Sequence, residues 1–167
     1  SEDWNFAGNN WTIDLWVKFS STSGYQIFAS QYDNATHQWQ VYKDTNGALG
    51  IKAWNNGVSA GSLATAALSW DSNWHHIAFE RLSDKGYIFI DGALKVNASV
   101  FSGSFPNTAN TLLIGSDNGA GNFFKGWLDE FRVTPQVARW TNNFSNPNAY
   151  EPSRITKRVR LDYANPS

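Results

Sequence analysis

Alternation of apolar and polar residues with a period of two runs through most of the chain. In residues 12–19 (TIDLWVKF), Ile13, Leu15, Val17 and Phe19 share one parity, and the other parity is mostly polar. Such alternation is typical of a strand with one buried face. The same pattern returns in residues 38–43, 49–54, 74–81, 87–90 and 127–133. The pattern therefore predicts a series of half-buried strands.

Turn signals separate these segments. Asn46-Gly47 lies between residues 38–43 and 49–54, and Asp91-Gly92 follows residues 87–90, so both pairs predict tight antiparallel hairpins. Clusters rich in Asn, Gly and Ser predict longer loops that cross between sheets, at residues 55–62, 101–111 and 116–122. One segment is helical in character, residues 135–141 (PQVARWT), where Pro suits the first helical position.

Many short strands with almost no helix predict an all-β fold, a two-sheet antiparallel β-sandwich or jelly roll. We expect one short helical turn near 135–141. Residues 1–150 are predicted to form the sandwich, and residues 151–167 a C-terminal extension. Because RITKRVRLDY in that extension alternates in part, it is a candidate for an added strand.

Composition and charge exclude several classes. The chain of 167 residues has no Cys, which rules out disulfides and thiol nucleophiles. A net charge of −1 with scattered Lys and Arg argues against nucleic acid as a partner. No apolar run reaches the ~18 residues of a membrane span, so membrane insertion is not expected. The start at Ser1 carries no leader pattern, which suggests a mature or excised segment.

Four stretches follow the order of motifs in laminin G-like jelly-roll domains. They are FAGNNWTIDLWVKF, WHHIAFER, GYIFIDG and LLIGSDNGAGNFFKGWLDEFRVTPQVARWTNNF, within about Asp3 to Pro147. The chain resembles most the concanavalin A-like lectin/glucanase domains of bacterial surface proteins and of bacteriophage and marine-virus structural proteins. The resemblance implies an architectural role for Trp16, Trp74, His76, Asp91, Gly92, Gly115, Gly126, Asp129, Glu130 and Arg132.

The resemblance has one gap. Family members usually carry an initial strand of the kind LxFDGxxDY, which is missing before the first segment, while VRLDYANPS at the C-terminus resembles it loosely. The chain is then a fragment, or Val159 to Tyr163 fills that place within the chain or in a neighbouring copy. An unfilled sheet edge would make self-association possible.

Glycanases with this fold carry two Glu on one strand in an E-x-D-x-x-E pattern, and a retaining mechanism needs carboxyl groups about 5 Å apart. No such pattern occurs here, and Asp129 and Glu130 are adjacent, so they should point to opposite faces. A nucleophile elbow of the G-x-S-x-G type is also missing. We therefore expect no catalytic residues and no enzyme.

Surplus aromatic residues are the best functional signal among the nine Trp and six Tyr. A sugar ring needs a flat apolar face for stacking, with amide or carboxylate groups beside it to bond hydroxyls. Aromatic residues flank the loops near Asp33 and near Asn55, although the alternative is that they plug the open ends of the sandwich. The candidate ligand-binding residues are Tyr32, Asn34, Trp39, Trp54, Asn55 and Trp70.

Asp129 lies on an apolar parity between Trp127 and Phe131, so its charge needs compensation. Backbone amides or His76 could satisfy it. The alternative is a calcium site, with Asp117 and Asn118 from residues 116–119, or Asp33 and Asn34, as further oxygen ligands. His75 and His76 are consecutive and should not bind one metal together.

These observations leave two main hypotheses. The first is a non-catalytic carbohydrate-binding or adhesion module whose partner is a glycan or polysaccharide. The second is a structural or display domain of a virion or cell-surface assembly that binds no small ligand. A glycoside hydrolase is a distant third. In each of the first two cases we expect the domain to act outside the cell, at a cell surface or on a virion.

Overall fold

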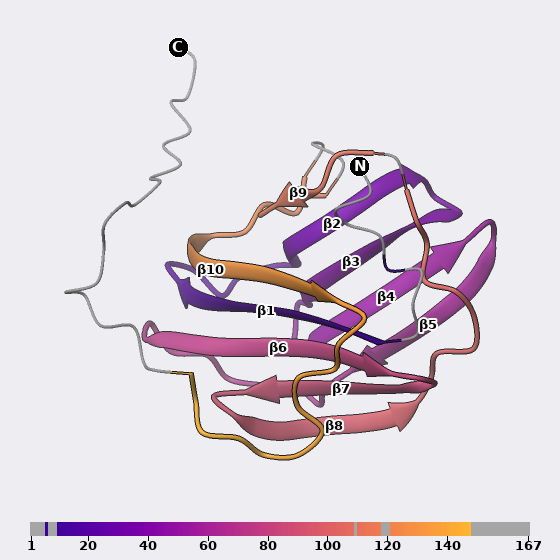
Figure 1. Ribbon diagram of the computed structural model, residues 1–167. Coiled ribbons are helices and arrows are strands. Elements are labelled where there is room, and N and C mark those ends of the chain that lie inside the picture. The colour runs from indigo at the N-terminus through magenta and orange to yellow at the C-terminus, as the bar shows by residue number, and fades with distance from the viewer. Residues whose placement is uncertain (1–5, 7–9, 109, 118–120, 148–167) are drawn as a thin grey trace, which may run out of the picture.

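The computed structural model describes residues 6, 10–108, 110–117 and 121–147, which form two antiparallel five-stranded sheets (Figure 1). One sheet has the strand order β10-β1-β6-β7-β8, and we call it the β1 sheet. The other has the order β5-β4-β3-β2-β9, and we call it the β3 sheet. The strands are β1 (Asn10–Phe19), β2 (Gln26–Asn34), β3 (His37–Lys43), β4 (Leu49–Asn55), β5 (Val58–Ala64), β6 (Trp74–Leu82), β7 (Lys85–Ile90), β8 (Ala93–Ser99), β9 (Leu113–Ile114) and β10 (Gly126–Pro135).

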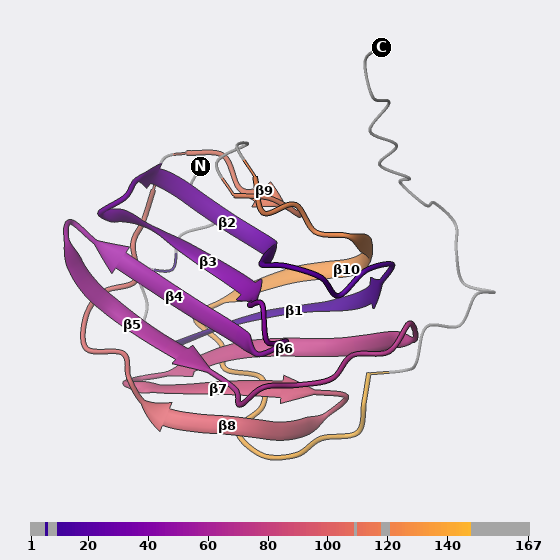
Figure 2. The same cartoon turned by 180° about the vertical axis from the view of Figure 1, so that it is seen from behind.

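This architecture confirms the predicted all-β sandwich, which is consistent with a jelly roll. Figures 1 and 2 show the two sheets from opposite sides, with the β3 sheet nearer the viewer in Figure 2. The described residues contain no helix, and so none with the length and hydropathy that crossing a membrane requires. The predicted extension at 151–167 lies outside the described residues.

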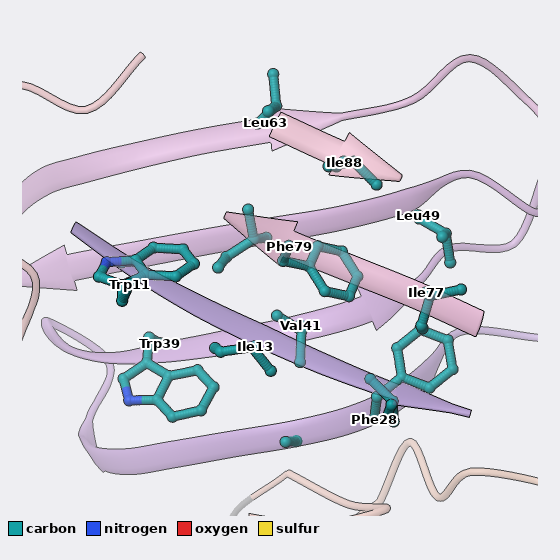
Figure 3. Packing of buried hydrophobic residues seen from close by; sticks show 14 of the residues in the cluster. Trp11, Ile13, Phe28, Trp39, Val41, Leu49, Leu63, Ile77, Phe79 and Ile88 are labelled. Atoms are coloured by element: carbon teal, nitrogen blue, oxygen red, sulfur yellow. The ribbon is translucent and has the colours of Figure 1, made fainter. Parts of the chain in front are cut away.

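Apolar side chains from both sheets fill the space between the layers (Figure 3). From β1, Ile13, Leu15 and Val17 have no exposed surface, as their shared parity predicted, and Trp11 before them is equally buried. Trp39 of β3 faces them from the other sheet. Burying a side chain of this size contributes about 2–3 kcal/mol, so the core supplies most of the driving force for folding.

Tight turns join the neighbouring strands. Asp91-Gly92 takes positive φ angles of 50° and 77°, which confirms the predicted hairpin between β7 and β8. Asn46-Gly47 does join β3 to β4, within the connection of residues 44–48. The prediction of a loop over residues 55–62 was wrong, because Asn56-Gly57, with φ angles of 50° and 84°, forms a tight turn and β5 begins directly after it at Val58.

The predicted helical turn at 135–141 was also wrong. Pro135 ends β10 opposite Trp11, and residues 136–147, which we call the strap, cross the outer face of the β1 sheet without forming a helix (Figure 1). Tertiary hydrogen bonds replace helical ones: Thr12 Oγ1 donates to Val137 O at 2.9 Å and accepts from Arg139 N at 3.0 Å. A segment this short has little helical stability of its own, so these contacts decide its conformation.

The strap covers a second apolar cluster on that outer face. Trp140 and Phe144 stack with ring centroids 4.0 Å apart and pack on Ala78, Tyr87 and Phe89. The outer face of the β1 sheet is therefore largely occupied by the chain itself. The outer face of the β3 sheet has no such cover from the strap.

Candidate functional site

The outer face of the β3 sheet presents the residues of β3 and β4 whose parity is opposite to the core. Trp39, Val41, Ile51 and Ala53 belong to the core, so their neighbours along each strand point outward. Those outward residues are Gln38, Gln40 and Tyr42 on β3 and Gly50, Lys52 and Trp54 on β4. The register pairs them as Gln38 with Trp54, Gln40 with Lys52 and Tyr42 with Gly50.

Three aromatic rings surround one cation on this face. Lys52 Nζ lies 5.3 Å from the ring centroid of Tyr25, 5.2 Å from that of Tyr42 and 5.6 Å from that of Trp54. Tyr25 and Tyr42 stack with centroids 5.0 Å apart and an interplanar angle of 23°. We call Tyr25, Tyr42, Lys52 and Trp54 the aromatic platform.

The absence of a side chain at Gly50 allows the platform to form. A Cβ atom at Gly50 would lie 2.3 Å from Cζ and 2.4 Å from the hydroxyl oxygen of Tyr42. The Tyr42 ring therefore lies directly over the backbone of β4. Glycine is needed here because of this close approach, since Gly50 does not have a positive φ.

Polar groups lie beside the platform. Tyr25 Oη donates to Gln40 Oε1 at 3.4 Å, and Ser30 Oγ donates to Ser116 O at 2.9 Å, which ties the loop after β9 to this face. The next residue in that loop, Asp117, lies close enough for its charge to act on both Tyr25 and Lys52. The Asp117 carboxylate accepts a hydrogen bond from Asn122 Nδ2 at 2.6 Å. Amide, hydroxyl and carboxylate groups thus border the rings.

Burial shifts the protonation equilibria of the platform. Desolvation raises the pKa of the Tyr25 hydroxyl, with smaller contributions from Tyr42, Asp117 and Asp44, and it also raises the pKa of Tyr42. Both phenols are therefore neutral at physiological pH and can donate hydrogen bonds. Desolvation lowers the pKa of Lys52, and Asp117 partly offsets that effect.

Two of the six predicted ligand-binding residues lie on this face. Tyr32 pairs with Gln38 across β2 and β3, and Gln38 pairs with Trp54 across β3 and β4. Tyr32 and Trp54 thus belong to one cross-strand row with an amide between them. Both side chains are partly exposed.

The other four predicted residues lie away from the platform and make contacts within the fold. Trp39 has no exposed surface and donates from Nε1 to Gln31 Oε1 at 2.9 Å inside the core, so a ligand cannot reach it. Trp70 packs on Phe19 and donates to Gly47 O at 2.7 Å, at the end of β4 away from Trp54.

The two predicted asparagines hold loops in place. Asn55 Nδ2 donates to Ser104 O at 3.2 Å and so anchors the loop that precedes β9. Asn34 Oδ1 accepts from the backbone N and from the hydroxyl of Thr36, at 2.9 and 2.7 Å, within the turn between β2 and β3. Neither residue belongs to the platform.

The structure does not bring the predicted calcium ligands together. Asp129 pairs with Trp16 in the β1 sheet and accepts from the backbone N of Glu130 at 2.8 Å, whereas Asp117 lies beside the outer face of the β3 sheet. Asn118 is outside the described residues. Among the residues that the structure describes, no three His, Asp or Glu side chains are grouped as metal ligands. His76, proposed as a partner of Asp129, bonds Asp14 at 3.2 Å instead.

Two carboxylates do lie on the same face of the β1 sheet, but they are closed off. Asp14 is 2% exposed, and Arg132 donates to it from Nε and a terminal nitrogen at 2.9 and 2.6 Å. Glu80 is 1% exposed and accepts from Trp140 N in the strap. In this arrangement a saccharide cannot reach either carboxylate to use the two as acid and nucleophile.

The residues that sequence reasoning missed are Tyr25, Gln38, Gln40, Tyr42 and Lys52. Four of them lie in segments whose alternation was recognised, and the parity opposite to the apolar one would have identified them. Tyr25 precedes β2 and carries no comparable signal.

Comparison with solved structures supports the same fold. The chain is similar to the CBM40 domain of Ruminococcus gnavus IT-sialidase, with a TM-score of 0.65, 17% identity and 78% of each chain covered. It is also similar to domain 4 of AbnA, a GH43 extracellular arabinanase from Geobacillus stearothermophilus, with a TM-score of 0.58, 21% identity, 75% of this chain and 60% of that chain. Mouse laminin alpha1 domains LG4-5 match with a TM-score of 0.58 and 16% identity over 77% of this chain and 36% of that chain.

The sequence itself gives a family match. A search of curated proteins found no significant match to the chain. The model of the concanavalin A-like lectin/glucanases superfamily, by contrast, matches residues 1–141. That range includes every described strand, from β1 to β10. The chain belongs to the concanavalin A-like lectin/glucanases superfamily.

Proposed function

We propose that this domain is a non-catalytic carbohydrate-binding module and that it binds saccharide on the outer face of the β3 sheet. The aromatic platform carries the proposal: three rings around Lys52 offer stacking surfaces, and the partly exposed Gln38 offers an amide on the same face. Sugar rings have apolar faces edged by hydroxyls, and this surface matches both features. The site is shallow, so weak binding is expected.

Two of the structural relatives support this proposal. The R. gnavus domain has been solved with α2,3-sialyllactose and the G. stearothermophilus domain with arabinotriose. One is the CBM40 domain of a sialidase and the other is a domain of an arabinanase, and each holds a saccharide. By analogy, the present domain would direct a larger protein to a glycan outside the cell.

A glycan array compares the wild-type domain with two variants that each lose one partly exposed Trp. We expect Trp54→Ala to weaken binding about tenfold, which corresponds to the loss of one stacking contact. Trp127 is the matched control, because it is 53% exposed but lies on the β1 sheet. Trp127→Ala should bind as wild type does.

Equal losses in both variants, or none in Trp54→Ala, would contradict the proposed location. Running the array in calcium and in chelator tests whether a metal takes part. If no saccharide on a broad array binds the wild-type domain, the function proposed here is wrong, and a structural or display role becomes the better account.

A further inference from the structure

Within the described residues, Lys52 is a cation without an ion-pair partner. Among the residues that the structure describes, no carboxylate oxygen lies within 4.0 Å of Lys52 Nζ, since the recorded salt bridges join only Asp71, Asp91 and Asp14 to His75, His76 and Arg132. Three ring faces hold the ammonium group instead. Cation–π contacts stabilise such a group but do not neutralise its charge.

The position of Lys52 is costly for its charge. The side chain is only partly exposed, and burial lowers its pKa because the charged form loses solvation. Asp117 offsets part of this cost from a greater distance than an ion pair. A ligand anion at Lys52 would regain the lost interaction as a charge-assisted hydrogen bond.

The outward strand residues around Lys52 are neutral, and the charges nearest the platform are the carboxylates of Asp117 and Asp44. Of the outward residues of β3 and β4, which are Gln38, Gln40, Tyr42, Gly50, Lys52 and Trp54, only Lys52 is charged. The nearby carboxylate of Asp117 would repel a second ligand anion and could accept hydrogen bonds from hydroxyls. The face therefore suits one negative charge among many hydroxyls.

We infer that the platform selects an acidic saccharide with a single anionic group, whose ring stacks on the aromatic side chains while its carboxylate or sulfate pairs with Lys52. This inference rests on the proposed function and specifies its ligand. The inference distinguishes singly charged glycans from polyanions. The carboxylate of Asp117 repels the further charges of a polyanion, whereas a single anion can pair with Lys52.

The test uses an array on which glycans ending in a uronic acid, another carboxylate sugar or a sulfated sugar are printed beside their neutral counterparts and beside heparin oligosaccharides. Wild-type domain should bind the best singly charged glycan about tenfold more tightly than its neutral counterpart. Added NaCl should reduce that ratio, because salt screens the ion pair. The carboxylate and sulfate arms identify which anion Lys52 takes.

Three variants isolate the charges. Lys52→Met keeps the apolar stem and should bring acidic and neutral glycans to similar affinity, whereas Lys52→Arg should retain the preference. Asp117→Asn should strengthen the binding of heparin oligosaccharides. Circular dichroism spectra of each variant, compared with that of wild type, check that the sandwich is retained.

The outcomes separate the two claims. Strongest binding by neutral glycans or by heparin, or a preference that survives in Lys52→Met, overturns this inference and leaves the proposed function intact. Absence of any glycan binding overturns both.

Discussion

At the scale of single residues, the described part of the protein buries several charged side chains, and polar partners surround two of them, Lys43 and Asp14. Lys43 is fully buried, and its ammonium donates to the carbonyl oxygens of Thr22, Gly24 and Asp44 at 2.6–2.9 Å. Asp14 pairs with Arg132 and His76, and these hydrogen bonds lower its pKa although burial alone would raise it. Buried charges without such partners are too costly to keep.

Glu80 is the exception, because it is nearly fully buried and forms no salt bridge with any residue that the structure describes. Burial raises its pKa to about 8 from 4.5, the charge of Asp14 adds to the rise, and the hydrogen bond from Trp140 N and the charge of Arg139 oppose it. The folded pKa exceeds the unfolded one, so the contribution to stability is complete below pH 4.5 and is lost as the pH rises through about 8.

Glu80→Gln should therefore change the pH dependence of stability. The variant keeps an oxygen that can accept from Trp140 N but cannot ionise. Between pH 4.5 and 8, wild type should lose stability relative to the variant by an amount on the order of a few kcal/mol. Urea unfolding at a series of pH values measures this difference, and parallel curves for the two proteins would contradict the assignment.

At the scale of elements, a strand could be predicted from the sequence when its buried face is made of apolar side chains. Strands such as β1 and β6 were predictable because their apolar parity fills the core. β2 was missed because Gln26, Ser30 and Gln31 are buried polar residues bonded to loops and to Trp39, which hides the alternation. β5 was missed because its residues are small, and Gly61 there makes room for the ring of Phe101.

The same packing logic applies to the platform, which depends on the close approach of Tyr42 to β4. Gly50→Ala should push the Tyr42 ring off the strand and weaken saccharide binding several-fold, although no ligand-contacting side chain is changed. The cost in stability should stay below about 1 kcal/mol, because the clashing atoms lie at the outer end of a partly exposed side chain, which can move.

Gly103→Ala is the matched control for that substitution. A Cβ atom at Gly103 meets nothing within 4 Å, and its φ is not positive, so both stability and binding should match wild type. Thermal unfolding and the glycan array give the two measurements. If Gly50→Ala binds saccharide as tightly as wild type does, the position of the Tyr42 ring is unimportant for binding.

At the scale of the whole molecule, the two outer faces of the sandwich differ. The strap, through Trp140 and Phe144, covers much of the outer face of the β1 sheet. The outer face of the β3 sheet carries the aromatic platform with its one cation, Lys52. The sequence was sufficient for the fold class and the family. The sequence was insufficient for the site, because Trp39 and Trp54 both lie beside loops rich in polar residues. Only the packing of the two sheets shows that Trp39 points into the core and Trp54 onto the outer face.

The central claim is that saccharide binds the outer face of the β3 sheet. An amide correlation spectrum of the isotope-labelled domain, titrated with its strongest array ligand, tests this residue by residue. The account predicts that shifts concentrate at Tyr25, at Gln38–Tyr42, at Gly50–Trp54 and near Ser116. Shifts centred on Trp127 and Lys18 of the β1 sheet, or on Trp70 at the end of the sandwich, would contradict it.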